Sequence, residues 1–131
     1  MAGKPVTTRT SLATARCDMV LEMTMAVDMA ARFRGFLPVV VDIETGGFDP
    51  TRHAILEIAM VLLGFNAVTL APIERWQRAV SPYQGSRIEA ASLKITGIDP
   101  HDPDRKSVSE ATAVKEMFTQ IRKCIKAAGC H

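Results

Sequence analysis

The sequence has no long hydrophobic run and no marked excess of one charge. Its longest nearly unbroken apolar stretch covers residues 55–63, far short of the ~20 residues that a membrane-spanning helix needs. Lysine and arginine number 16 against 14 acids, which gives a net charge of +2. A weakly basic chain permits a nucleic-acid partner without requiring one. With 47% hydrophobic and 23% charged residues, wholesale disorder is excluded and a folded globular chain is expected.

Cysteine and histidine are also scarce. The three cysteines are Cys17, Cys124 and Cys130. An odd number with no Cys-x-x-Cys spacing excludes a disulfide framework and favours free thiols in a reducing, cytoplasmic compartment. The three histidines, His53, His101 and His131, are scattered. Without a cluster of cysteine and histidine, a zinc site is not expected.

The 131 residues have room for one domain. Residues 1–31 differ from the rest, because the first sixteen carry Lys4, Arg9 and Arg16 but no acid, and a methionine-rich stretch that is predicted to be helical follows. A basic, acid-poor N-terminus is typical of a transit peptide. The alternatives are an unstructured extension or translation from a start codon placed too early. We therefore separate an N-terminal extension, disordered or helical, from a domain over residues 32–131.

Three β-strands are predicted in the first half of this domain. The β-branched run 39–44 ends at Thr45-Gly46-Gly47, which is typical of a strand that enters a turn. The apolar run 55–63 is interrupted only by Glu57, and we interpret it as a second strand because the order then suits a meander. A weaker strand is expected near residues 76–80.

Two helices are predicted in the second half. Ser86 and Glu89 have the spacing of a capping box, which predicts a helix over residues 87–94 that stops before Gly97. Ser107 and Glu110 form a second box, which predicts a helix over residues 110–126 that Gly129 ends. Its expected apolar face consists of Ala111, Val114, Met117, Phe118, Ile121 and Ile125. The fold class is therefore α/β.

The chemically informative residues are two acids on the first strand. Asp42 and Glu44 are two positions apart, so their side chains point to the same side of the strand. Two neighbouring carboxylates repel each other, and a divalent ion such as Mg²⁺ or Mn²⁺ resolves that repulsion. The glycines that follow allow a close approach of the backbone to a substrate. The alternative, a solvated end of an edge strand, remains open on this pattern alone.

Longer stretches carry a family resemblance. Residues 42–48, Asp-Ile-Glu-Thr-Gly-Gly-Phe, followed by Leu-Glu-Ile-Ala at 56–59, resemble the first motif of the DEDD exonucleases. The lead Arg-Phe-Arg-Gly-Phe at 32–36 and the segments 97–105 and 125–130 are similar to the ribonuclease T family within that superfamily. These stretches are spread over residues 32–131.

This resemblance implies a fold and an activity. The fold would be RNase H-like, a mixed sheet flanked by helices, here truncated to its first three strands and two helices. The activity would be metal-dependent 3′–5′ exoribonuclease hydrolysis, with two Mg²⁺ ions, or Mn²⁺ in their place. The substrates would be single-stranded 3′ ends of transfer RNA and other stable RNAs, the enzyme would be a homodimer, and no membrane partner is expected.

The resemblance also implies residue roles. Asp42 would bind both metal ions and Glu44 one of them. The backbone around Thr45 and Gly46 would approach the terminal nucleotide, and Phe48 would stack on its base. Ile95 takes the place of a second aromatic stacking residue, against which a base stacks less well. The basic residues expected to hold the RNA backbone are Arg32, Arg34 and Lys126.

The chain departs from the family pattern at its end. It stops at His131, before the expected second motif, a His-Asn stretch followed by Phe-Asp, and before the third motif with its histidine general base. None of the three histidines matches that base. We therefore expect an N-terminal fragment that is inactive alone, with the strand at 39–43 left as an exposed sheet edge. The alternatives are a non-catalytic fragment that binds RNA or dimerises, and a chain without a stable fold.

Overall fold

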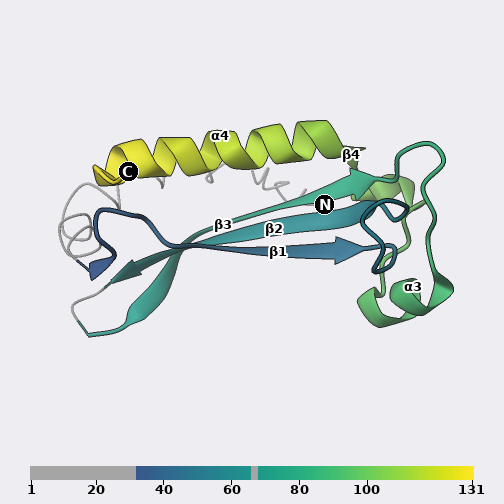
Figure 1. Ribbon diagram of the computed structural model, residues 1–131, viewed down its shortest axis with the longest axis horizontal. Coiled ribbons are helices and arrows are strands. Elements are labelled where there is room, and N and C mark those ends of the chain that lie inside the picture. The colour runs from purple at the N-terminus through teal and green to yellow at the C-terminus, as the bar shows by residue number, and fades with distance from the viewer. Residues whose placement is uncertain (1–31, 66–67) are drawn as a thin grey trace, which may run out of the picture.

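The computed structural model describes residues 32–65 and 68–131, so the expected N-terminal extension, with Cys17, lies outside the described residues. Figure 1 shows the elements in space. In chain order they are β1 (Val39–Thr45), β2 (Ile55–Phe65), β3 (Leu70–Ser81), α3 (Ala90–Thr96), a 3₁₀ turn (Pro103–Arg105), β4 (Val108–Ser109) and α4 (Glu110–Ala128).

The strands form one mixed sheet in the order β1-β2-β3-β4. The first three are an antiparallel meander, as the sequence predicted, and the two-residue β4 adds a short parallel pairing beside the end of β3. β3 begins at residue 70, earlier than the predicted 76. The early part was missed because it contains Pro72, which the strand accommodates at a register shift opposite Leu62 and Leu63.

α4 packs along one face of this sheet, as Figure 1 shows. Every second residue of β2 is buried, from Leu56 to Gly64, and Ile58, Met60 and Leu62 among them pack against α4. The buried residues of α4 are Ala113, Met117, Cys124 and Ala128. None of the helices in the described ranges is long and apolar enough to cross a membrane.

The predicted apolar face of α4 was partly wrong. Met117 is buried, and Ile121 and Ile125 pack at the margin of the core, as expected. Ala111 and Phe118 are exposed, the latter to 47%. The helix instead approaches the sheet through small side chains at 113, 124 and 128, and a pattern based on large apolar residues does not find these.

The first capping box does not cap a helix. Ser86 donates its hydroxyl to the carbonyl oxygen of Tyr83 at 2.7 Å, which closes a turn. α3 begins three residues later than predicted, with Glu89 at its N-cap and no side-chain cap hydrogen bond. Residues 86–89 are held away from the helix because they pair with the loop that follows β1.

The N-cap of α4 is two residues later than the second capping box predicts. Ser107 shares a 2.7 Å hydroxyl hydrogen bond with Ser81, so its oxygen is engaged by β3. Ser109 is the N-cap of α4 and accepts a hydrogen bond from the Thr112 amide at 3.2 Å. The C-terminal predictions are confirmed, because Gly97 and Gly129 end their helices in the left-handed conformation.

β1 lies at the edge of the sheet, with β2 as its only strand neighbour among the described residues. Its apolar side chains are incompletely covered, with exposures of 52% for Val40, 44% for Val41 and 45% for Ile43. In this part of the chain the strand is therefore the open edge that the sequence predicted.

A pair of matched substitutions tests the core. Leu62 is fully buried between β2 and α4, whereas Leu70 is 45% exposed at the start of β3. Leu62→Ala should lower the free energy of unfolding by about 2–5 kcal/mol, because it leaves a cavity. Leu70→Ala should cost less than about 1 kcal/mol. Urea denaturation followed by circular dichroism measures both, and equal costs would contradict the packing described above.

Candidate active site

Asp42 and Glu44 point to the face of the sheet that α4 leaves uncovered. In the β1–β2 register, Val41 lies opposite Met60 and Ile43 opposite Ile58, whose side chains are buried beneath α4. Because successive side chains alternate between faces, the two acids project from the other side, which we call the open face. Asp42 is exposed and Glu44 is half-buried.

A third carboxylate lies beside this pair. Glu57 of β2 is directly opposite Glu44 in the register and shares the open face. Like charges in directly opposed positions destabilise a strand pair. Within the described residues, none of the three carboxylates forms an ion pair. The open face therefore carries uncompensated negative charge at the end where β1 enters its loop.

The three carboxylates meet some of the requirements of a divalent-cation site. Carboxylate oxygens are the ligands that Mg²⁺ prefers, and protein sites often supply only one or two of them beside retained waters. Among the described residues, however, no three His, Cys, Asp or Glu side chains gather closely enough to hold an ion. Asp42 and Glu44 thus fit a metal by donor type, but they supply only part of a ligand set.

The loop after β1 is tightly tied down. The Gly46 amide donates to the Ala54 carbonyl at 2.9 Å, and the Gly46 carbonyl accepts the Glu89 amide at 2.7 Å. The hydroxyl of Thr45 donates to the carbonyl oxygen of Gly47 at 2.8 Å. These polar groups of Thr45 and Gly46 are therefore already used within the chain, although both residues were expected to face the terminal nucleotide.

His53 fastens this loop to the segment that leads into α3. Its side chain is only 7% exposed. The amide of Asp49 donates to Nδ1 at 2.9 Å, so the ring hydrogen is on Nε2, which faces Oε1 of Glu89 at 3.3 Å. A Cβ added to Gly47 would lie 2.5 Å from this ring. Imidazole and glycine therefore fit together, and we call the contact of His53 with Gly47, Asp49 and Glu89 the loop clamp.

The clamp sets Phe48 and Ile95 at one end of the sheet. Phe48 is 92% exposed in the clamped loop, and Ile95 is 80% exposed on α3, which follows Glu89 directly. Figure 1 shows α3 beside the end of β1. Two large apolar side chains thus stand in solvent near the end of the strand that bears the acids.

Asp49 stabilises the same loop from its outer side. The hydroxyl of Thr51 donates to Oδ1 of Asp49 at 2.6 Å and the Thr51 amide donates at 2.9 Å. These hydrogen bonds, with a smaller contribution from nearby positive charge, lower the pKa of Asp49 below its usual 3.8. The hydrogen bonds of this turn therefore favour the ionised carboxylate.

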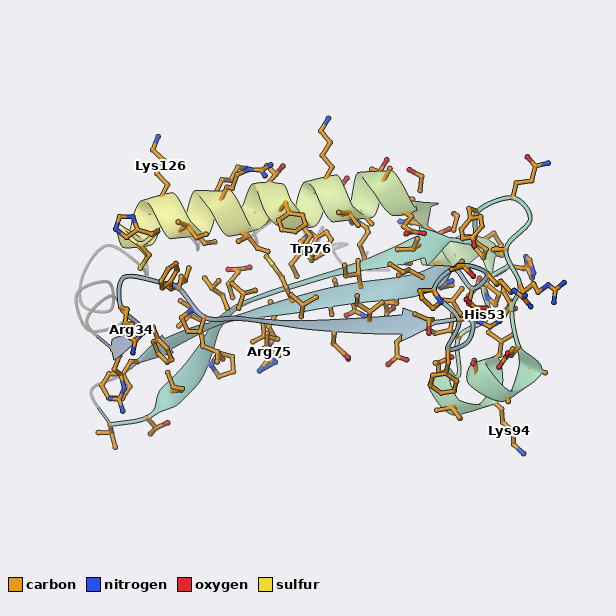
Figure 2. All side chains as sticks on the ribbon, viewed as in Figure 1. Arg34, His53, Arg75, Trp76, Lys94 and Lys126 are labelled. Carbon is orange, nitrogen blue, oxygen red and sulfur yellow. The ribbon has the colours of Figure 1, made fainter. Side chains whose placement is uncertain are left out.

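The three basic residues predicted to hold RNA lie elsewhere. Figure 2 shows Arg34 and Lys126 at the end of the molecule opposite His53. Arg32 is in the same segment as Arg34, with its guanidinium 4.0 Å from the ring centroid of Phe65. β1 lies between the two ends, and its residues span roughly 20 Å. The structure therefore does not bring these cations together with Phe48 and Ile95.

Comparison with known proteins settles the family. A protein-family model described as "Exonuclease" matches residues 39–130. The chain belongs to this exonuclease family. The expected fold class is thereby confirmed, because a mixed sheet of four strands with two helices fits a truncated RNase H-like exonuclease fold.

Individual relatives agree with this assignment. A ribonuclease T from Marinobacter nauticus is 46% identical over 103 residues, which cover 78% of this chain and 47% of the relative. A ribonuclease T from Hahella chejuensis is 45% identical over 104 residues, covering 79% of this chain and 48% of the relative. The chain thus spans about half the length of the curated relatives it matches, and the predicted resemblance to ribonuclease T is confirmed.

Two residues of the candidate site are not among the residues predicted from the sequence. Glu57 belongs to the Leu-Glu-Ile-Ala stretch of the family resemblance and interrupts an apolar strand, but the sequence analysis assigns it no role in the site, although an acid in such a run is itself a signal. His53 was set aside because it matched no catalytic position. Its structural role depends on a contact with residues 87–89, and no local spacing reveals that contact.

The fit between Gly47 and His53 gives a testable prediction. The φ of Gly47 is 159°, at the limit of the range that residues with a side chain rarely adopt, so an alanine there is opposed by the imidazole and also by the backbone. Gly47→Ala should cost about 1–3 kcal/mol of unfolding free energy, as overpacking does. In a His53→Ala background the added methyl group finds space, so the two costs should be non-additive by at least about 0.5 kcal/mol.

Urea denaturation of the wild type, both single variants and the double variant completes this cycle. Additive costs would show that the ring does not fill the space over Gly47.

Proposed function

We propose that this chain supplies the acidic half of the active site of a ribonuclease T-type 3′–5′ exoribonuclease, which trims transfer RNA and other stable RNAs. The observation that carries the proposal is the placement of Asp42 and Glu44 together on the open face, without ion-pair partners among the described residues. Membership of the exonuclease family supports it.

Asp42 and Glu44 would hold Mg²⁺, or Mn²⁺ in its place, in a two-ion site. When bound, such ions activate a water molecule and stabilise the leaving oxygen of an in-line displacement. The carboxylates themselves fix where this charge is held relative to the RNA terminus. In the described part of the chain no histidine is grouped with the two acids. These residues therefore supply only part of a metal-ligand set and no general base.

The exposed apolar residues would orient the terminal nucleotide. Phe48 offers an aromatic face on which a base can stack, a contact of roughly 1–3 kcal/mol. Ile95 offers an aliphatic surface from α3, so the second contact is weaker than an aromatic one. The loop clamp holds the loop with Phe48 and the helix α3 with Ile95 in fixed positions relative to each other. Thr45 and Gly46 shape the turn between the acids and Phe48.

The opposite placement of the cations favours a homodimer. One short RNA end cannot reach Phe48 and also Arg32, Arg34 and Lys126 of the same chain without running along the sheet. Two copies arranged head to tail would place the basic end of one beside the clamped loop of the other. Phosphate contacts from these cations would make RNA binding sensitive to salt.

A catalytic test requires a version of the chain extended to the full length of its relatives. Asp42→Asn should abolish Mg²⁺-dependent shortening of a 5′-labelled RNA while leaving the circular dichroism spectrum unchanged. Asp104→Asn, which removes an equal charge in the exposed 3₁₀ turn, is the matched control and should trim normally. Survival of activity in the Asp42 variant would show that this carboxylate is not a metal ligand.

The alternative, RNA binding without turnover, is favoured by the incomplete ligand set. The purified 131-residue chain should therefore bind single-stranded RNA at low salt, yet leave a 5′-labelled RNA uncut in Mg²⁺ or Mn²⁺. Gel electrophoresis and fluorescence anisotropy measure the two properties. Metal-dependent trimming by this chain would contradict the inference that its site is incomplete.

A further inference from the structure

A groove of about 440 Å³ lies between β3 and α4, and no role in the proposed reaction involves it. Trp76 and Arg78 line it from the strand, and Lys115, Glu116, Thr119 and Lys123 line it from the helix. Figure 2 shows Trp76 on the α4 side of the sheet and Arg75 on the opposite side. The groove and the open face with its acids are therefore on opposite faces of the sheet.

The charges of the groove are unequal. Glu116 is its only acid, and the guanidinium of Arg78 already engages it, with Nε at 2.8 Å and Nη2 at 2.7 Å from Oε2. Lys115 and Lys123 have no ion-pair partner within the described residues. Two positive charges are therefore left over for an anionic ligand.

The groove also contains an aromatic side chain. Trp76 is partly buried against the core beneath α4 and lines the groove. The Arg78 guanidinium lies 5.7 Å from the centroid of its ring, which holds two planar groups next to each other. Aromatic rings and arginine planes beside lysines are the combination that binds single-stranded nucleic acid, by stacking bases and neutralising phosphates.

The wall at β3 adds hydrogen-bonding groups. β3 pairs with β4 only at Val80 and Ser81, so residues 70–79 have no strand partner on that side among the described elements. The Thr119 hydroxyl on the groove wall already donates to the Lys115 carbonyl at 2.7 Å, so it can only accept a further hydrogen bond. The backbone groups of β3 can bond the sugars and base edges of a strand that lies along the groove.

We propose that this groove is a second binding site for single-stranded RNA, separate from the site for the 3′ end. A base stacks at Trp76 and Arg78, and Lys115 and Lys123 bind the adjacent phosphates. The inference extends the proposed function, because it assumes an RNA-processing chain, but it requires neither a metal ion nor a free 3′ terminus. The groove would hold the body of an RNA molecule away from the acids.

The chain contains a single tryptophan, so its fluorescence reports on this groove alone. We would titrate the 131-residue chain with a single-stranded oligouridine that carries a 3′-phosphate and so lacks a free 3′ hydroxyl. Trp76 fluorescence should be quenched at about 50 mM salt, and the affinity should fall as salt rises, with a contribution near −1.4 to the log–log slope from two phosphate contacts.

A matched pair of double variants tests the lysines. Lys115→Ala with Lys123→Ala should weaken binding roughly tenfold and flatten the salt slope by about 1.4. Lys94→Ala with Lys106→Ala removes the same charge from exposed positions that do not line the groove, and should change neither quantity by more than about twofold. All four lysines are exposed, so both proteins should fold, as circular dichroism can verify.

Three results would overturn the proposal. They are an absence of quenching at low salt, an equal loss of affinity in the control variant, and equal quenching by a polyglutamate peptide, which would indicate an acidic protein partner. The test is independent of catalysis. If a full-length version trims RNA but Trp76 of the 131-residue chain shows no quenching, the groove proposal fails and the proposed function stands. If Trp76 of the 131-residue chain is quenched but the full-length version does not trim RNA, the proposed function fails and the groove proposal stands.

Discussion

α4 lies on only one face of the sheet, and the placement of the polar chemistry follows from this. β2 buries side chains beneath the helix, so the register between β1 and β2 determines which residues of β1 share the covered side. Val41 and Ile43 take those positions, and Asp42 and Glu44 are directed to the other face. A shift of one residue in this pairing would turn the two acids toward the helix and expose the valine and isoleucine fully. Burial of apolar side chains therefore fixes the position of the acidic pair without any contact to the acids themselves.

The same alternation separates two surfaces of opposite charge. The open face collects Asp42, Glu44 and Glu57, which repel phosphate groups unless cations are present. The groove between β3 and α4 has surplus lysines and can attract an RNA strand without help. If both surfaces act, the affinity of the chain for RNA and its affinity for metal ions are set by different residues. Binding without turnover is then a natural property of this half of the domain, and added metal would change what happens at the RNA terminus more than whether RNA binds.

The sequence predicts those parts of the fold that depend on the conformational preferences of residues close together in the chain. The run of β-branched residues before Gly46, the alternation of the acids and the glycine ends of both helices follow from backbone preferences, and the structure has all of them. The start of α3 was misplaced because the hydroxyl of Ser86 bonds to Tyr83 and does not cap a helix. α4 begins at Glu110 as predicted, but its N-cap is Ser109, because Ser81 engages the hydroxyl of the predicted cap Ser107. Likewise, the clamp brings His53 against Gly47 and Glu89, and neither contact is encoded in the spacing of the residues that form it.

The two parts of the candidate site, the loop with Phe48 and the strand with the acids, are held in place by different contacts. The loop with Phe48 is secured at several points by hydrogen bonds and by the buried imidazole, so its shape does not depend on the free edge of β1. The acids are on that edge strand, whose backbone is paired on one side only within the described residues. A further strand beside β1 would order the carboxylates and also bring more ligands to the open face, whereas it would change the clamped loop little. The part of the site proposed to orient the nucleotide is therefore organised within this chain, and the part proposed to hold metal depends on what pairs with β1.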